Sequence, residues 1–190
     1  MKTFALPPLL AAVAMFVLGA IYWMSPFPYS VLGRVADDSA AAAQLSKIFP
    51  ATGTYLIPGA YLDPKVAASL MEQGPSATVQ FVKEGHALMA PTVMVAGFVH
   101  YWVIALLLTF FLNHIRSTFH GYSCVVKAAA VIGVLAAGLI NFSDPIWWHH
   151  PWPWHLVCAA YNVLEFIVAG LVLGIFLKPA GTAAAPSPAA

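Results

Sequence analysis

The sequence predicts an all-α fold: a four-helix transmembrane bundle with a helical extracytoplasmic cap between the first and second helices. Composition is the first indication, because 61% of the 190 residues are hydrophobic and 8% are charged, against about 25% charged in soluble domains. Four apolar runs are the second, since a helix needs about 20 residues to cross a bilayer. They cover about residues 5–24, 88–112, 125–147 and 154–177. Segment 26–87 is too long for a plain connector, so we expect it to be structured.

The distribution of charge predicts the orientation of the four spans. Lysine and arginine accumulate in short cytoplasmic segments, whereas long translocated loops cross the membrane regardless of charge. If the spans alternate, one side carries four basic residues and no acidic residue: Lys2, Arg116, Lys127 and Lys178. Most of the acidic residues fall within segment 26–87. We therefore expect both termini in the cytoplasm and segment 26–87 outside it.

The first run is expected to stay in the protein rather than to be removed as a signal peptide. It is longer than the apolar region of a signal peptide, which has about 7 to 15 residues. It also ends in Tyr22 and Trp23, which are typical of anchors at a membrane interface. At the other end of the chain, residues 179–190 are alanine, proline, glycine, serine and threonine. This composition predicts a disordered tail after a single membrane domain covering residues 1–178.

The cap is expected to consist of short helices and turns. Its first helix is capped by Asp37 or Asp38 and continues through Ile48. The stretch 54–62 is too apolar for a solvated loop, so we expect it against the lipid headgroups or over the mouth of the bundle.

Proline and glycine delimit the later part of the cap. Asp63 and Pro64 form an N-cap and N1 pair that opens a second helix, which ends at Gly74. A third helix begins at Ser76 in this interpretation. It continues without a break through His86 into the second span.

Small residues recur every four positions in the third and fourth spans. Ala129, Gly133 and Ala137 have this spacing in the third, and Gly170 and Gly174 have it in the fourth. Small residues on one face allow helix backbones to approach closely in a membrane. Tight helix contacts are therefore predicted, either within the bundle or between copies in a homo-oligomer or a larger membrane complex.

Glu165 is the first candidate site residue, because it lies at the midpoint of the fourth span. A carboxylate is costly there and usually faces a partner or a cavity. His155, Cys158, Asn162 and Glu165 recur at helical spacing, with Tyr161 adjacent, and predict one polar stripe along that helix.

His100 occupies the midpoint of the second span. If its face meets the polar stripe of the fourth span, a glutamate and a histidine lie together in the middle of the membrane. Such a pair can hold a proton, orient a ligand or bind a metal. The alternatives are that the two side chains only hydrogen-bond each other, or that Glu165 is a neutral acid bonded to Asn162.

Other histidines lie near the outer membrane boundary. His149, His150 and His155, with Asp144 nearby, are candidate zinc or copper ligands, although the adjacent His149 and His150 side chains should diverge. Their alternative role, together with the neighbouring tryptophans, is anchoring at the interface. His86, just before the second span, is a candidate ligand for a metal or heme iron. No basic cluster exists to favour nucleic-acid binding.

Parts of the first and fourth spans resemble a family of small four-span bacterial membrane proteins of unknown function. The resemblance lies in residues 11–26, 159–164 and 169–174, with an aromatic pair, serine and proline ending the first helix. It implies a multi-pass protein of the bacterial inner membrane and brings no activity.

A fainter similarity is to styrene oxide isomerase, a four-span membrane enzyme that binds heme b through a histidine entering its second helix. The residues concerned are Gly19, Trp23, Met24, 57–59, His86 and 141–143. The similarity implies His86 as the iron ligand, with the iron acting as a Lewis acid on an epoxide oxygen.

Three functions follow from these observations. The favoured one is a membrane protein with a midplane polar pocket for a lipophilic small molecule, lined by Glu165, His100, Asn162 and Tyr161. The second is a heme- or metal-dependent membrane enzyme, isomerase-like, with His86 as ligand. The third is a structural subunit of a membrane complex in which Glu165 pairs with a partner.

Overall fold

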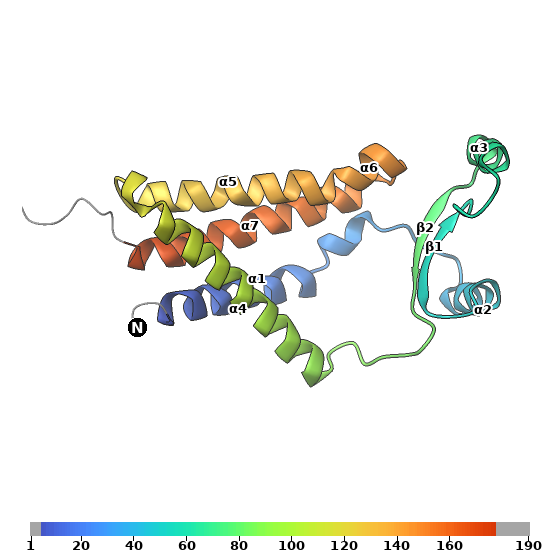
Figure 1. The fold of residues 1–190 in the computed structure, drawn as a ribbon. Coiled ribbons are helices and arrows are strands. Elements are labelled where there is room, and N and C mark those ends of the chain that lie inside the picture. The colour runs from blue at the N-terminus through green and yellow to red at the C-terminus, as the bar shows by residue number, and fades with distance from the viewer. Residues whose placement is uncertain (1–4, 178–190) are drawn as a thin grey trace, which may run out of the picture. The chain divides into compact units, whose positions relative to one another are not determined.

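The computed structural model describes residues 5–177 and divides the chain into two compact units (Figure 1). One unit combines Met1–Leu32 with Pro91–Ala190, and the other is Gly33–Ala90. The expected tail 179–190 and the basic residues Lys2 and Lys178 lie outside the described residues.

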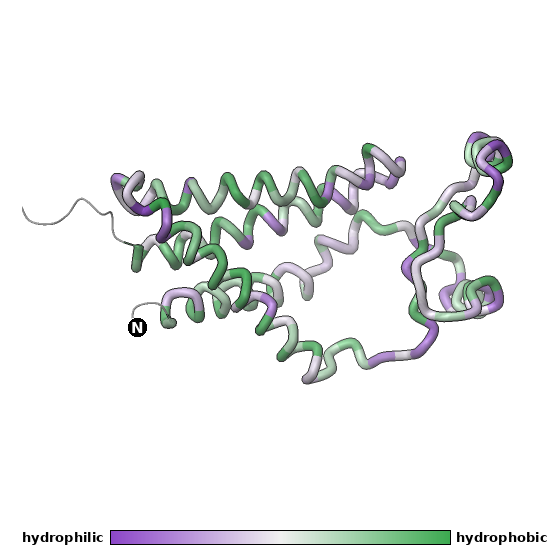
Figure 2. Tube along the Cα trace, in the orientation of Figure 1, coloured by the Kyte–Doolittle hydropathy of each residue, from purple (hydrophilic) through white to green (hydrophobic). Residues whose placement is uncertain are grey.

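Four long helices make up the first unit: α1 (Leu6–Met24), α4 (Pro91–His114), α5 (Tyr122–Asn141) and α7 (Trp152–Phe176). Each is long and apolar enough to cross a membrane, the third candidate extending from Tyr122 to Trp147 through the short helix α6 (Ser143–Trp148). Figure 2 shows hydrophobic residues along all four. The number of apolar helices is as predicted, and their bounds differ from the predicted ones by at most three residues.

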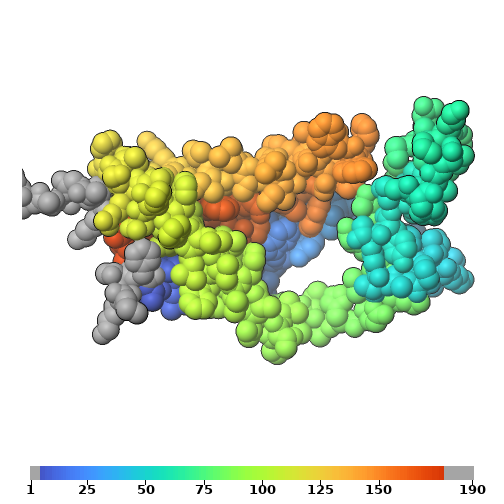
Figure 3. Space-filling model, in the orientation of Figure 1, coloured from blue at the N-terminus to red at the C-terminus, as the bar shows by residue number. Residues whose placement is uncertain are grey.

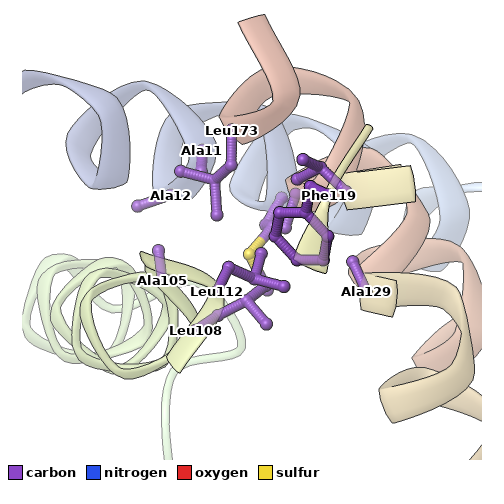
Figure 4. Close-up of a cluster of buried hydrophobic side chains, with 11 residues drawn as sticks. Ala11, Ala12, Ala105, Leu108, Leu112, Phe119, Ala129 and Leu173 are labelled. Carbon is purple, nitrogen blue, oxygen red and sulfur yellow. The ribbon is translucent and has the colours of Figure 1, made fainter. Parts of the chain in front are cut away.

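The contacts between neighbouring helices, which we call seams, differ in extent. Helix α1 packs on both α4 and α7, and α5 packs most extensively on α7, whereas α4 and α5 meet only weakly. A short 3-10 helix, η3 (Arg116–Thr118), joins α4 to α5. The core takes side chains from all four helices, including the inaccessible Ala12, Leu112, Ala129 and Leu173 (Figure 4).

Small residues explain the close packing of α5 on α7. A Cβ added at Gly170 would lie 2.7 Å from the Cβ of Ala129 and 3.2 Å from the backbone Cα of Val126. A Cβ added at Gly133 would lie 2.8 Å from the Cβ of Phe166. The tight contacts predicted from the small-residue pattern are therefore present within this chain.

The second unit is mixed rather than purely helical. Its elements are α2 (Asp38–Ile48), β1 (Gly53–Ile57), α3 (Pro64–Gln73) and β2 (Ala77–Phe81). The strands pair antiparallel, Gly53 opposite Phe81 and Ile57 opposite Ala77.

Two of the three helices predicted for this unit are confirmed. The Asp37 carboxylate caps α2 by accepting a hydrogen bond from the Ala40 amide at 3.0 Å. The Asp63 carboxylate caps α3 through the Lys65 amide at 2.9 Å.

The predicted third helix, from Ser76 through His86 into the second span, is wrong. Residues 77–81 form β2, the segment 82–90 is not helical, and α4 begins at Pro91. The reason is that Thr78 and Val79 are β-branched residues, which favour a strand when a partner such as β1 is available to pair with.

A small aromatic cluster holds the second unit together. Phe49 is buried, and its ring centroid lies 4.5 Å from that of Tyr55 and 5.3 Å from that of Phe81. Beside it, the Thr52 hydroxyl donates to the Glu84 carboxylate and accepts from the Lys83 amide at 2.9 Å. The hydrogen bond from Thr52 holds the pKa of Glu84 below its usual value.

Candidate functional site

Glu165 lies inside the first unit, on α7. Its side chain is 9% exposed, and its Oε1 atom is fully buried without a hydrogen-bond partner among residues 5–177. Its carboxyl group interacts with the hydroxyl groups of Tyr161 and Tyr101 and, electrostatically, with His100. The acid is therefore turned inward, as expected for a costly group in the middle of an apolar helix.

Two tyrosines from different helices meet beside this carboxyl group. The hydroxyl oxygens of Tyr101, on α4, and Tyr161, on α7, lie 2.7 Å apart and share a hydrogen bond. Gly19, on α1, makes room for them, because a Cβ there would lie 2.7 Å from the Tyr161 oxygen and 3.2 Å from the Tyr101 oxygen. Three helices thus contribute to one polar cluster, which we call the Glu165 site: Glu165, Tyr101, Tyr161 and Gly19.

Aromatic rings at the end of α1 hold Tyr161 in place. The ring centroids of Tyr22 and Trp23 lie 4.9 and 5.1 Å from that of Tyr161. The Tyr22 hydroxyl donates to the backbone carbonyl of Val157 at 2.9 Å, which ties α1 to α7 at this level. These contacts give the Tyr161 hydroxyl a defined position relative to Glu165.

His100 is placed differently from its neighbour Tyr101. The His100 side chain is exposed, as are Ala96 and Thr92, four and eight residues earlier on α4. Its ring lies 5.5 Å from that of Tyr101, and Tyr101 makes the contact with α7. His100 is close enough to Glu165 to interact electrostatically, so its role as a ligand-binding residue stays a prediction.

Asn162 is half-buried on α7, next to Tyr161. Within the described part of the chain, no hydrogen bond joins its amide to Glu165. The alternative in which Glu165 is satisfied by Asn162 is therefore not what the structure shows.

The weak seam between α4 and α5 leaves one flank of α7 uncovered. In Figure 3 the surface is recessed between α4 (yellow-green) and α5 (gold), and α7 (red) is visible at the base of the recess. This agrees with the small contact between α4 and α5, compared with the contacts that α7 makes with α5 and α1.

The outer histidines form a second cluster. Ligand atoms of Asp144, His150 and His155 all lie within 4.8 Å of one another. His149 is exposed and takes a left-handed backbone conformation (φ 56°, ψ 30°) at the end of α6. Of the three histidines proposed as metal ligands, the structure brings together His150 and His155, with Asp144 and without His149.

His86 lies in the second unit, between β2 and α4. Its side chain is exposed, and it is five residues before the first residue of α4. It is also the only histidine in Gly33–Ala90, which contains no cysteine. Its role as a ligand for heme iron or another metal stays a prediction.

Sequence reasoning missed Tyr101 and Gly19. Tyr101 carried a signal, because a tyrosine in the middle of an apolar helix is far from the interface where tyrosines usually lie. Gly19 carries no such signal. Its packing role depends on which helix faces it, which the sequence does not state.

Comparison of the chain with protein-family models, curated proteins and solved structures finds no match.

Proposed function

We propose that this chain is a multi-pass protein of the bacterial inner membrane that binds a lipophilic small molecule at the Glu165 site. Both termini lie in the cytoplasm and the unit Gly33–Ala90 lies outside it. One observation carries the proposal: Oε1 of Glu165 is buried beside two tyrosine hydroxyls and has no hydrogen-bond partner among residues 5–177.

The surface of the four long helices supports the membrane location. Large apolar side chains are exposed along them, including Leu107, Phe110, Leu135, Leu139 and Ile175, each more than 60% accessible. Soluble monomers rarely expose apolar patches beyond a few hundred Å². Exposed apolar side chains of this kind are suited to contact with the hydrocarbon of a bilayer.

The chemistry of the site favours a ligand that carries a hydrogen-bond donor. The bond between the two tyrosine hydroxyls uses one of their two hydrogens, and the tyrosines also interact with the Glu165 carboxyl group, but its Oε1 atom accepts no hydrogen bond among residues 5–177. Leaving a buried polar group unsatisfied costs about 1–3 kcal/mol, more if it is charged. A hydroxyl or amine group on an otherwise apolar molecule supplies the missing donor.

The recess between α4 and α5 supports lateral entry of such a molecule. A lipophilic ligand dissolved in the bilayer reaches a protein from its side rather than from water. Helix α4, which contributes Tyr101 to the Glu165 site, borders this seam, and α7, which contributes Glu165 and Tyr161, lies at the base of the recess. The burial of Glu165 favours a small ligand over the side chain of a partner subunit.

The test compares ligand retention with stability. We expect the protein purified in lipid nanodiscs to retain a lipophilic compound, identified by mass spectrometry of the extract, and Glu165→Leu to lose it. The melting temperature of Glu165→Leu should stay equal or rise, because replacing a poorly satisfied buried polar group with an apolar one is often neutral or stabilising.

Thr109→Val is the matched control. Thr109 is a second buried polar residue of the bundle, but its hydroxyl donates to the Ala105 carbonyl of its own helix at 2.6 Å. This variant should retain the compound. If Glu165→Leu keeps the same compounds as the wild type and also lowers the melting temperature, Glu165 is structural and the proposal fails.

A further inference from the structure

A second site, separate from the Glu165 site, is built where α6 meets α7. We infer that Asp144, His150 and His155 bind one divalent transition-metal ion, with zinc as the ion the site suits. Two imidazoles and one carboxylate are the protein ligands found in open zinc sites and in the two-histidine, one-carboxylate sites of non-heme iron.

The backbone explains how residues separated along the chain come together. Asp144 lies in the first turn of α6, and His149 ends that helix in a left-handed conformation. This conformation reverses the chain, so that the His150 amide nitrogen donates a hydrogen bond to the Asp144 carbonyl oxygen at 3.5 Å. Pro151 then occupies the N-cap position of α7, which places His155 in the first turn of that helix.

The distances are close to those that a metal ion requires. The Nδ1 atom of His150 lies 3.9 Å from Oδ2 of Asp144, and the rings of His150 and His155 are 5.7 Å apart between centroids. Bonds of about 2.1 Å in a tetrahedral site hold ligand atoms about 3.4 Å apart. The three ligand atoms, all within 4.8 Å of one another, therefore need to close by at most about 1.4 Å, which side-chain rotation can supply.

The surroundings of the three residues suit a bound ion. All three residues are half-buried, and Pro145 beside Asp144 is buried, so the site is partly shielded from water. Prolines at 145, 151 and 153 restrict the backbone on each side of His150. Three protein ligands also leave one coordination position for water, as in catalytic zinc sites.

The experiment measures zinc on the full chain purified in detergent without a polyhistidine tag. After equilibration with a micromolar zinc buffer, we expect one zinc per chain by elemental analysis. We also expect zinc to raise the melting temperature by about 5 °C. Asp144→Asn, His150→Ala and His155→Ala should each weaken binding by at least about 100-fold, since even indirect partners of a metal contribute 10- to 100-fold.

His149→Gly is the matched control, because it changes the adjacent histidine that the structure excludes from the site. Glycine also adopts the left-handed conformation without strain, so the loop keeps its shape. This variant should bind zinc as the wild type does and show the same zinc-dependent rise in melting temperature.

Two results would overturn the site. One is a wild-type zinc content no higher than that of the double variant H150A/H155A. The other is a loss of zinc in His149→Gly equal to that in His150→Ala, which would mean that any exposed histidine binds adventitiously. Because the zinc-dependent shift in melting temperature is measured within each variant, a variant that is merely less stable still gives a clear answer.

Discussion

At the scale of single residues, the Glu165 site depends on the absence of a side chain at Gly19. Close packing leaves no space for one more carbon atom between α1 and the two tyrosine hydroxyls. Inserting a methyl group into a well-packed interior usually costs about 1–3 kcal/mol. The site is therefore sensitive to a residue that carries no chemistry of its own.

We predict that Gly19→Ala separates the Tyr101 and Tyr161 hydroxyls and lowers the melting temperature. The added Cβ would lie 2.7 Å from one hydroxyl oxygen and 3.2 Å from the other. Gly97→Ala, on α4, is the control, since its Cβ would meet only Phe16 at an ordinary 4.0 Å. Thermal unfolding of the purified protein measures both. Equal melting temperatures for the two variants would show that Gly19 is not tightly packed.

A second prediction at this scale concerns Glu84 in the cap unit. The Thr52 hydroxyl bonds to its carboxylate and keeps its pKa below the ordinary value. Because the folded-state pKa is the lower one, this contribution to stability is present above the unfolded pKa and is lost as the pH falls through the folded pKa. Thr52→Val should raise the pKa of Glu84 towards its usual value, which NMR titration of the side-chain carboxyl measures. An unchanged titration would exclude the Thr52 bond as the cause.

At the scale of elements, the α5–α7 pair is the most closely packed part of the first unit. Its contact depends on glycines that face backbone or Cβ atoms, which cannot move away as the end of a long side chain can. An added side chain at Gly133 or Gly170 would therefore push the two helices apart.

We predict that Gly170→Ala destabilises the protein by about 1–3 kcal/mol. Its new Cβ would meet Ala129 at 2.7 Å and the backbone of Val126 at 3.2 Å. Gly138→Ala on α5 is the matched control, because no atom lies within 4 Å of a Cβ there, and alanine favours a helix over glycine by up to about 1 kcal/mol. Unfolding in a denaturing detergent compares the two. A stabilising effect at Gly170 would contradict the packing described.

For these elements, the sequence predicts position better than rotation or pairing. Hydropathy alone locates the four long helices, because their length and apolar character are local properties. It does not give their rotation. His100 and Tyr101 are neighbours on a helix that is apolar on nearly every side, so no pattern indicates which of them faces α7. Strand β2 is also hard to predict from local sequence. Residues 77–81 form a strand by pairing with β1, and the whole of α3 lies between the two strands along the chain.

At the scale of the whole molecule, the orientation of the spans is a prediction from charge. We expect a green fluorescent protein fused after residue 190 to fluoresce in cells, as cytoplasmic fusions do, and alkaline phosphatase inserted in segment 26–87 to be active outside the cytoplasm. The reverse pattern of activities would show that the chain inserts the other way round. Hydropathy is the same in both orientations, so only such labels distinguish them.

The unequal seams between the helices have a consequence for biogenesis. Helices α5 and α7 are close in the chain, are joined through α6, and share the largest contact. They can therefore associate as a hairpin as soon as both have left the translocon. Helix α4 has its main partner in α1, which is synthesised before the whole of Gly33–Ala90. We thus expect α1 to remain in the lipid without its partner α4 until α4 has been inserted. During this interval the proteases that degrade unassembled membrane helices can recognise α1.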